Sequence, residues 1–312
     1  MSTSPPHVGD GSLLVYFGHH KAASTWVNRH VRAICRKFGL RQRSVPSAEA
    51  VEGGVGALVR REGIGFLSMT NADVHYLSDL PRFRGFHVVR DPRDVVVSAF
   101  YSHRDTHELR QDWMREHRAA LRTMTVQDGL LREIERSGWN MTHLREWDYG
   151  RPDVLELKME DLTADASNGW LEITRFLGLL QSDASTVSGR VQRFGRRLRA
   201  TTHRRTGGRI APPRRYLSED TVRGIVDKYA FQRITKGRAP GEEDATSHFR
   251  KGVPGDWRNH FGSEHRELFD ELWGDILLKL GYERDRSWVD PELRTGASDP
   301  ELRTGASDEG EL

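Results

Sequence analysis

The sequence predicts an α/β fold in which helices flank a central parallel sheet. Two observations predict it. Short apolar runs with the length and branching of buried strands alternate along the chain with stretches of helical periodicity. Hydrophobic residues make up 36% of the 312 residues and include 8 Trp and 12 Phe, which is enough for a large core. Strands and helices that alternate in this way are typical of a parallel sheet covered on both faces.

Four strands are predicted, at residues 13–17, 65–69, 86–89 and 154–159. The first runs through a polar loop into a helix that Ser24 and Thr25 can cap. The third runs into a helix with Asp91 as N-cap, Pro92 at the first position and Asp94 in a pattern like a capping box. Further helices are predicted at residues 170–180, 218–228 and 264–280, the last of them stopped by Gly281.

The ends of the chain differ from its body. Residues 1–12 are rich in Pro, Gly and Ser and are predicted to form a disordered leader, followed by a single domain at 13–289. Residues 290–312 are predicted to be a disordered acidic tail, in which the nonamer 290–298 repeats perfectly at 299–307. Two copies of nine residues are too few for a solenoid, whose repeats run to roughly 20–50 residues.

The formal net charge of +3 is divided unevenly along the chain. The tail holds seven acidic residues and two arginines, a net charge of −5, which leaves +8 on residues 1–289. Ten arginines and no acidic residue lie in the basic stretch 190–215. A body this basic favours an anionic partner, which could be a nucleic acid, an acidic membrane or a phosphorylated small molecule.

Several classes of protein are excluded by the sequence. No apolar run approaches the roughly 20 residues needed to cross a bilayer. The first residues have neither the basic nor the apolar region of a secretory signal. The single cysteine, Cys35, rules out an internal disulfide and is too few for a structural zinc site. We therefore expect a soluble, cytoplasmic protein with no transmembrane segment.

The loop after the first strand has the features of an anion site. It spans residues 18–25 and ends where a helix begins, and unpaired N–H groups at a helix start attract anions. Lys21 adds a positive charge to this loop. A nucleoside triphosphate loop needs Ser or Thr directly after its lysine to hold magnesium, whereas Ala22 stands here. This departure weakens the interpretation as an ATP or GTP site.

Two later segments carry the same chemistry. Arg90 ends the third strand and Ser98 lies two turns into the next helix, so both can reach one anion at the sheet edge. The alternative for Arg90 is an ion pair with Asp94. The segment 250–261, RKGVPGDWRNHF, joins adjacent Arg and Lys to two glycines in a flexible loop that can wrap a phosphate.

These three segments, in this order, resemble the cytosolic and bacterial sulfotransferases that use 3′-phosphoadenosine 5′-phosphosulfate (PAPS). The resemblance spans residues 13 to about 283. It implies a three-layer P-loop-like fold and transfer of the sulfuryl group of PAPS to a hydroxyl or amine, with release of 3′,5′-phosphoadenosine (PAP) and no need of a metal. The implied acceptor is a small molecule, glycan or lipid, which could be anionic, and not a nucleic acid.

The resemblance also implies roles for the matching positions. Lys21 is expected to contact the bridging and sulfuryl oxygens and to act in catalysis, and backbone N–H groups from Ala23 to Thr25 to hold the 5′-phosphate. The adenine is expected between Trp26 and Phe231. The full set expected to bind PAPS is Lys21, Ala22, Ala23, Ser24, Thr25, Trp26, Arg90, Ser98, Phe231, Arg250, Lys251 and Gly252. From Arg90 onward, all of these except Phe231 are expected at the 3′-phosphate.

Some positions depart from the family pattern. Ala23 replaces a usual Gly, His20 a frequent Pro, and Met159 a Tyr that contacts the adenine. The catalytic histidine of the cytosolic enzymes would fall near residues 68–71, where no histidine stands. The candidates for the general base are His75, the nearest histidine downstream, and also His20, Glu49 and Glu52.

Two other functions stay open at this point. One is a nucleotide-dependent kinase of related fold. The other is a non-enzymatic protein that binds nucleic acid through the basic stretch 190–215, although this stretch lacks the interleaved aromatic residues of a single-strand groove.

Overall fold

The computed structural model describes residues 12–109, 111–181, 194 and 216–290. The predictions for the leader and the repeat tail lie outside these residues, apart from positions 12 and 290. The basic stretch 190–215 also lies outside them, apart from position 194.

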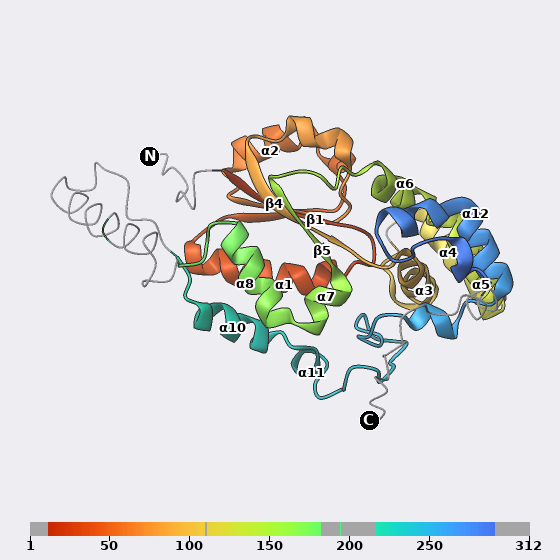
Figure 1. Ribbon diagram of the computed structural model, residues 1–312. Helices are drawn as coiled ribbons and strands as arrows, with labels where there is room; N and C mark the ends of the chain where they lie inside the picture. Colours follow the sequence, from red (N-terminus) through yellow and green to blue (C-terminus); the bar gives the residue numbers. More distant parts are fainter. Residues whose placement is uncertain (1–11, 110, 182–193, 195–215, 291–312) are drawn as a thin grey trace, which may run out of the picture.

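Five parallel strands form one sheet in the order β2-β3-β1-β4-β5 (Figure 1). The strands are β1 (Leu13–Gly18), β2 (Gln42–Val45), β3 (Phe66–Met69), β4 (Phe83–Val89) and β5 (Val154–Lys158). Every residue of the central strand β1 is buried, which explains its unbroken apolar run. The predicted parallel sheet is confirmed. The sequence did not indicate β2, because its segment QRSV is short and mostly polar.

Helices cover both faces of this sheet (Figure 1). On one face lie α1 (Ser24–Phe38), α7 (Met159–Ala164), α8 (Ala166–Phe176) and α10 (Glu219–Lys228). The other face is covered by α2 (Val55–Glu62). Alternate residues of β1 enter the two cores, Leu14 and Tyr16 on the α1 side, and Leu13, Val15 and Phe17 on the α2 side. The predicted three-layer arrangement is confirmed.

A third core lies beside the sheet, where helices from two distant parts of the chain pack together (Figure 1). These helices are α3 (Pro92–Tyr101), α5 (Val126–Arg136), α6 (Gly138–Glu146) and α12 (Ser263–Lys279). Between α3 and α4 (Asp112–Thr123) the chain forms a π-helical turn, η3 (Ser102–Thr106). The remaining short elements are η1 (Ala48–Ala50), η2 (Val74–Asp79), α11 (Phe231–Ile234), η4 (Asp256–Asn259) and η5 (Arg286–Trp288).

The helix starts show which capping predictions hold. Asp91 caps α3, since its carboxylate accepts the backbone N–H of Arg93 at 3.0 Å, with Pro92 at the first position. The prediction that Ser24 and Thr25 cap α1 is wrong, because the N-cap is Ala23 and no side chain caps this helix. The helix predicted at 170–180 begins earlier, at Ala166, because the Asp165 side chain accepts the N–H of Asn168.

Candidate functional site

A cavity of about 1270 Å³ opens at the carboxyl ends of β1, β3 and β4. Its walls include the loop after β1, Thr70 and Asn71 after β3, and Arg90 after β4. Ligands of parallel α/β sheets bind at this edge, because the strands end there and the following helices begin. Eleven of the twelve residues expected to bind PAPS line this cavity. The exception is Ala22, which is fully buried behind the loop.

The loop before α1 turns without a glycine. Lys21 and Ala23 both adopt left-handed backbone conformations, with φ of 60° and 56°. This conformation costs a residue with a Cβ roughly 1–2 kcal/mol, so Ala23 takes up a strain that the family's usual glycine avoids. Among the described residues, the backbone N–H groups of Ala23, Ser24 and Thr25 have no hydrogen-bond acceptor. They are the donors expected to receive a phosphate.

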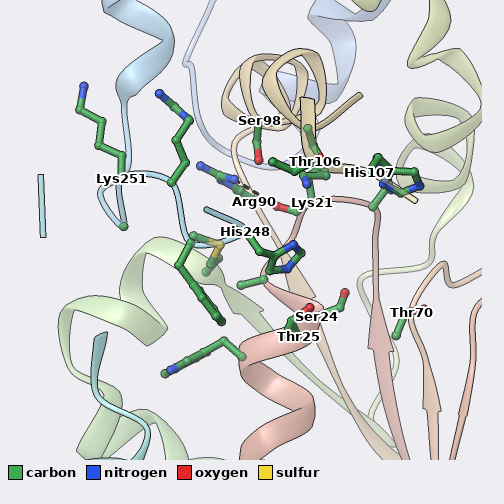
Figure 2. Close-up of a pocket in the computed structure, with 18 of the residues that line it drawn as sticks. Lys21, Ser24, Thr25, Thr70, Arg90, Ser98, Thr106, His107, His248 and Lys251 are labelled. Atoms are coloured by element: carbon green, nitrogen blue, oxygen red, sulfur yellow. Dashed lines mark hydrogen bonds between the residues drawn. The ribbon is translucent and has the colours of Figure 1, made fainter. Parts of the chain in front are cut away.

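Lys21 and Arg90 form a cationic centre at this loop. Arg90 donates from Nη1 to the backbone oxygen of Lys21 at 3.1 Å, and its buried Nε has no partner among the described residues. Burial first, and then the charges of Arg90 and Arg250, lower the pKa of Lys21 to about 8, against the opposing effect of the Glu133 carboxylate. Lys21, Arg90 and Ser98 lie close together in Figure 2. An anion fits this place, since it would satisfy Arg90 Nε and stabilise the lysine charge.

The alternative of an Arg90–Asp94 ion pair is not what the structure holds. The Asp94 carboxylate accepts the backbone N–H groups of Gly255 and Trp257, at 2.6 and 2.9 Å. Asp94 thereby fastens the C-terminal loop to α3 and leaves Arg90 to the cavity. Arg93 lies beneath, with its guanidinium 3.8 Å from the centre of the Trp257 ring.

The C-terminal loop presents Arg250 and Lys251 at the cavity wall. Arg250 pairs with Glu243 at 2.7 Å and also with Asp256, which holds Lys251 at 2.5 Å. Figure 2 shows Lys251 to one side of the group formed by Lys21, Arg90 and Ser98. The two C-terminal cations are therefore partly neutralised by carboxylates in direct contact, whereas Lys21 forms no ion pair within the described residues.

Gly252 is required by its backbone and by its neighbour. Its φ is 70°, and a Cβ at this position would lie 2.3 Å from a carbon of the Phe231 ring. Phe231 lines the cavity together with Trp26, whose indole N–H donates to the backbone oxygen of Tyr229 at 3.0 Å. Met159 also lines the cavity. The aromatic pair expected at the adenine therefore lies on the cavity that also holds Lys21.

Most candidates for the general base lie outside the cavity. His75 is 70% exposed and lies 3.4 Å from Glu146, and neither Glu49 nor Glu52 lines the cavity. The positions after β3 where the family has its histidine do reach the cavity, but they hold Thr70 and Asn71. The structure therefore places His75 outside the cavity, and of the four candidates only His20 lines it.

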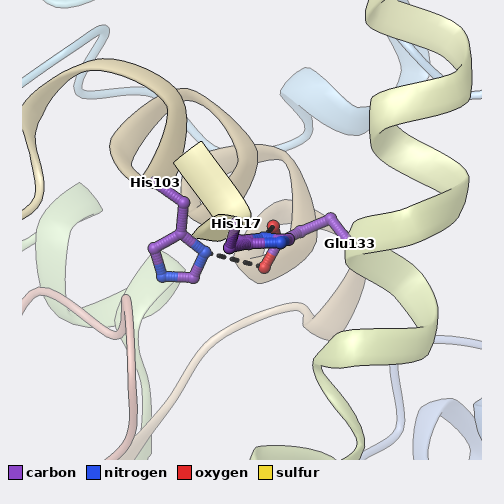
Figure 3. Close-up of side chains that lie close together, drawn as sticks. All are labelled: His103, His117 and Glu133. Atoms are coloured by element: carbon purple, nitrogen blue, oxygen red, sulfur yellow. Dashed lines mark hydrogen bonds and ion pairs between the residues drawn. The ribbon is translucent and has the colours of Figure 1, made fainter. Parts of the chain in front are cut away.

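A chain of hydrogen bonds runs from His20 into the protein. His20 Nε2 lies 3.1 Å from His103 Nε2, and His103 Nδ1 lies 2.9 Å from Glu133 Oε1. His117 Nε2 lies 2.9 Å from the other carboxylate oxygen (Figure 3). Burial raises the pKa of Glu133, but the hydrogen bonds from the two imidazoles outweigh burial and lower it to about 2. Glu133 is therefore a buried carboxylate ion.

The sequence carries no local signal for this series of hydrogen bonds from His20 to Glu133. His103, His117 and Glu133 come from η3, α4 and α5, and only the packing of these elements brings them together.

Comparisons with known proteins agree with the motifs. The model of the sulfotransferase domain matches residues 80–202. The chain is 24% identical over 213 residues to sulfotransferase 2B1 of Rattus norvegicus, which is 64% of this chain and 50% of that protein. The match thus spans about half the length of this curated relative.

Two solved structures are similar to this chain. A mouse sulfotransferase, SULT7A1, complexed with PAP, has a TM-score of 0.51 at 17% identity, over 86% of both chains. A retinol dehydratase in complex with androsterone and inactive cofactor PAP has a TM-score of 0.41 at 15% identity, over 85% of this chain and 80% of that one.

In the part of the chain that the structure describes, no helix combines the length and apolarity needed to cross a membrane. The mouse structure supports the fold, a parallel sheet between helices. Together, the domain match over residues 80–202, the curated relative and this fold confirm the predicted resemblance to the sulfotransferases and the predicted P-loop-like α/β fold.

Proposed function

We propose that this chain is a PAPS-dependent sulfotransferase, which moves the sulfuryl group of PAPS to a hydroxyl or amine of an acceptor and releases PAP. One observation carries the proposal. Three segments far apart in the sequence, around Lys21, Arg90 and Arg250, meet on one cavity. The first was expected to bind the 5′-phosphosulfate, and the other two the 3′-phosphate, of the same nucleotide.

The contacts within the cavity support a division of labour. The unpaired N–H groups from Ala23 to Thr25 suit the 5′-phosphate, as donors at a helix N-terminus. Arg90 Nε and Ser98, with the loop 250–252, suit the 3′-phosphate. Trp26 and Phe231 offer aromatic surface for the adenine.

Sulfuryl transfer requires positioning and charge stabilisation more than covalent participation by the protein. The acceptor oxygen or nitrogen forms a bond to sulfur, the bond from sulfur to the bridging oxygen breaks, and its electron pair stays on the 5′-phosphate. Lys21 is the cation best suited to stabilise this developing charge. Lys21 is half-buried at the cavity wall, where a charge interacts more strongly than in bulk water.

We assign the part of the cavity lined by Trp113, Arg136 and Trp139 to the acceptor, and call it the acceptor side. Its walls are aromatic and polar. Trp113 and Trp139 line it and are 39% and 44% exposed, which is high for indole rings. Arg136 lies over the Trp113 ring, 4.1 Å from its centre. Exposed rings in a cavity suit acceptors with a flat face, so phenols and sugars come first in a search for the acceptor.

The test compares the wild type with Lys21→Ala. We expect the wild type to bind PAP in calorimetry and to transfer ³⁵S from labelled PAPS to at least one acceptor in a panel of phenols, sugars, lipids and peptides. Lys21→Ala should lose about 100-fold or more in turnover, as enzymes do when one group that stabilises transition-state charge is removed. Full activity in the variant would remove Lys21 from catalysis.

The same experiments distinguish the other two functions. Preference for ATP with magnesium over PAPS, seen as the larger thermal stabilisation, would favour a kinase of related fold. Binding of random oligonucleotides that is tighter than PAPS binding and falls steeply with salt would favour a nucleic-acid-binding protein.

A further inference from the structure

We infer that His20 is the general base of the proposed transfer, and that His103 and Glu133 are positioning residues: His103 takes the proton on from His20, and Glu133 stabilises the charge that His103 then carries. The inference rests on the proposed function. It fills the role that the missing family histidine leaves open.

The position of His20 suits a base. It directly precedes Lys21 in the loop, it is half-buried, and it lines the cavity. Its Nε2 faces His103, and among the described residues its Nδ1 has no hydrogen-bond partner. His20 also lies next to the acceptor side of the cavity, because its ring centre is 5.6 Å from that of Trp139. His20 therefore has one nitrogen for the relay and one for an acceptor.

The hydrogen-bond chain determines which nitrogens carry protons. Glu133 is ionised and can only accept, so His103 must carry its proton on Nδ1. A neutral His103 then accepts at Nε2, and His20 must donate from its own Nε2. This leaves a lone pair on His20 Nδ1. Burial, and next the charge of Lys21, lower the pKa of His20 well below its usual value, so this lone pair is present at neutral pH.

The proton can then move in two balanced transfers. The acceptor O–H or N–H gives its proton to His20 Nδ1 as its oxygen or nitrogen bonds to sulfur. His20 gives its Nε2 proton to His103 Nε2, which returns His20 to neutrality. His103 becomes an imidazolium, hydrogen-bonded through Nδ1 to the Glu133 carboxylate, which stabilises its charge. The proton thus leaves the neighbourhood of Lys21, where a second positive charge would be costly.

Other assignments of these groups fit less well. His107 also lines the cavity, with its ring centre 5.7 Å from that of His20, but among the described residues no carboxylate accepts a hydrogen bond from it. The groups His103, His117 and Glu133 could also be considered as metal ligands. However, each oxygen of Glu133 already accepts a ring N–H at 2.9 Å, so a metal would have to displace both protons. The π-helical turn that carries His103 is a feature often found at functional sites.

The first arm of the test needs no acceptor. In long-range ¹⁵N spectra of the imidazole rings, assigned with His20→Asn and His103→Asn, the wild type should show His103 protonated on Nδ1 and His20 protonated on Nε2. If either ring carries its proton on the other nitrogen, the relay is overturned.

The second arm uses two probe acceptors with labelled PAPS. Phenol keeps its proton at neutral pH and needs a base, whereas p-nitrophenol is largely ionised under mildly alkaline conditions. We expect His20→Asn to lower kcat with phenol by about 100-fold or more, a typical loss for a general base, while p-nitrophenol restores most of the rate. PAP affinity should stay unchanged. The matched control is His75→Asn, the exposed histidine outside the cavity, which should keep the wild-type rate.

Glu133→Gln tests the positioning role. The amide can still accept from His103, but it cannot stabilise an imidazolium, so kcat should fall and the acidic limb of its pH profile should move to lower pH. The groups that face His20 and shape this limb are Lys21, His103 and His107. An unshifted limb would overturn the role of Glu133.

The failures of the two proposals are distinguishable. A wild type that does not bind PAPS overturns the proposed function and this inference with it. Intact PAPS binding together with a wild-type rate of His20→Asn on phenol, or with loss in His75→Asn instead, overturns this inference alone.

Discussion

Two similar chains of side chains begin at neighbouring residues of one loop. His19 Nε2 lies 2.7 Å from His87 Nε2, and His87 Nδ1 lies 2.6 Å from Glu156. His20 begins the second chain, through His103 to Glu133. Both run imidazole, imidazole, carboxylate. Consecutive residues at the end of an extended strand point to opposite sides, so one chain enters the sheet layers and the other enters the helical part beside the cavity.

The two chains differ at their first member. His19 is 1% exposed and its Nδ1 is buried, whereas His20 lines the cavity. His87 lies on β4 and Glu156 on β5, and Glu156 also accepts the indole N–H of Trp147 at 2.8 Å. The His19 chain therefore ties the end of β1 to two neighbouring strands. The same sequence of groups is structural where its first imidazole is buried and suited to proton transfer where its first imidazole lines a cavity.

The largest effects are expected from one pair of variants, His19→Asn and His20→Asn, which should differ in whether stability or turnover is lost. His19→Asn should lower the free energy of unfolding by about 1–3 kcal/mol, because it leaves a buried group of His87 without its partner. Its turnover per folded molecule should stay near wild type. His20→Asn should do the reverse. It should lower kcat by about 100-fold or more and lower the free energy of unfolding by at most about 1 kcal/mol.

Denaturant unfolding and kinetics on the same preparations measure both quantities. If His19→Asn folds normally and loses turnover as His20→Asn does, then burial does not distinguish the two chains.

A smaller effect is expected for Glu133, the carboxylate at the end of the His20 chain. The lowered pKa of Glu133 contributes stability that is fully present above the ordinary pKa of a glutamate, 4.5, and is lost as pH falls toward about 2. The difference in unfolding free energy between the wild type and Glu133→Gln should therefore narrow as pH falls through this window. Urea titrations at a series of acidic pH values measure it, and Glu135→Gln, on the exposed side of α5, controls for loss of a carboxylate. A difference that stays constant with pH would contradict the buried ion.

The comparison also shows what the sequence could predict. The fold and the proposed nucleotide site depend on local signals: apolar runs for β1 and β4, Asp91 and Pro92 at a helix start, and Lys21 in a loop between strand and helix. These features keep their meaning wherever the chain folds. The parallel sheet then brings the ends of its strands to one edge, so Lys21 and Arg90 meet without further information.

The proposed base and its hydrogen-bond partners could not be predicted in the same way. His103 and Glu133 are thirty positions apart on separate elements, and only the packing of α5 against α3 and η3 joins them. His19 and His20 are equivalent in sequence, and their different surroundings follow from the opposite sides to which they point after β1. His75 was the nearest histidine by sequence, but η2 leaves it on the outside. Proximity along the chain says little about which side chain faces a cavity.

The smallest expected effect is that of metal removal. His103, His117 and Glu133 would make a plausible set of metal ligands by type, but the ring nitrogens that face Glu133 carry protons in the relay, and a metal needs them bare. Dialysis against a chelator should therefore leave kcat unchanged, and added Zn²⁺ should inhibit, because it would remove the proton from His103 Nδ1 and hold that ring away from its role. If chelation abolished activity and Zn²⁺ restored it, these three residues would be a metal centre, and the proposed proton relay through His103 would be wrong. The chelator is not expected to act on His19, His87 and Glu156. If the free energy of unfolding, measured in the same samples, stays unchanged, a loss of activity comes from the His20 chain and not from a general loss of stability.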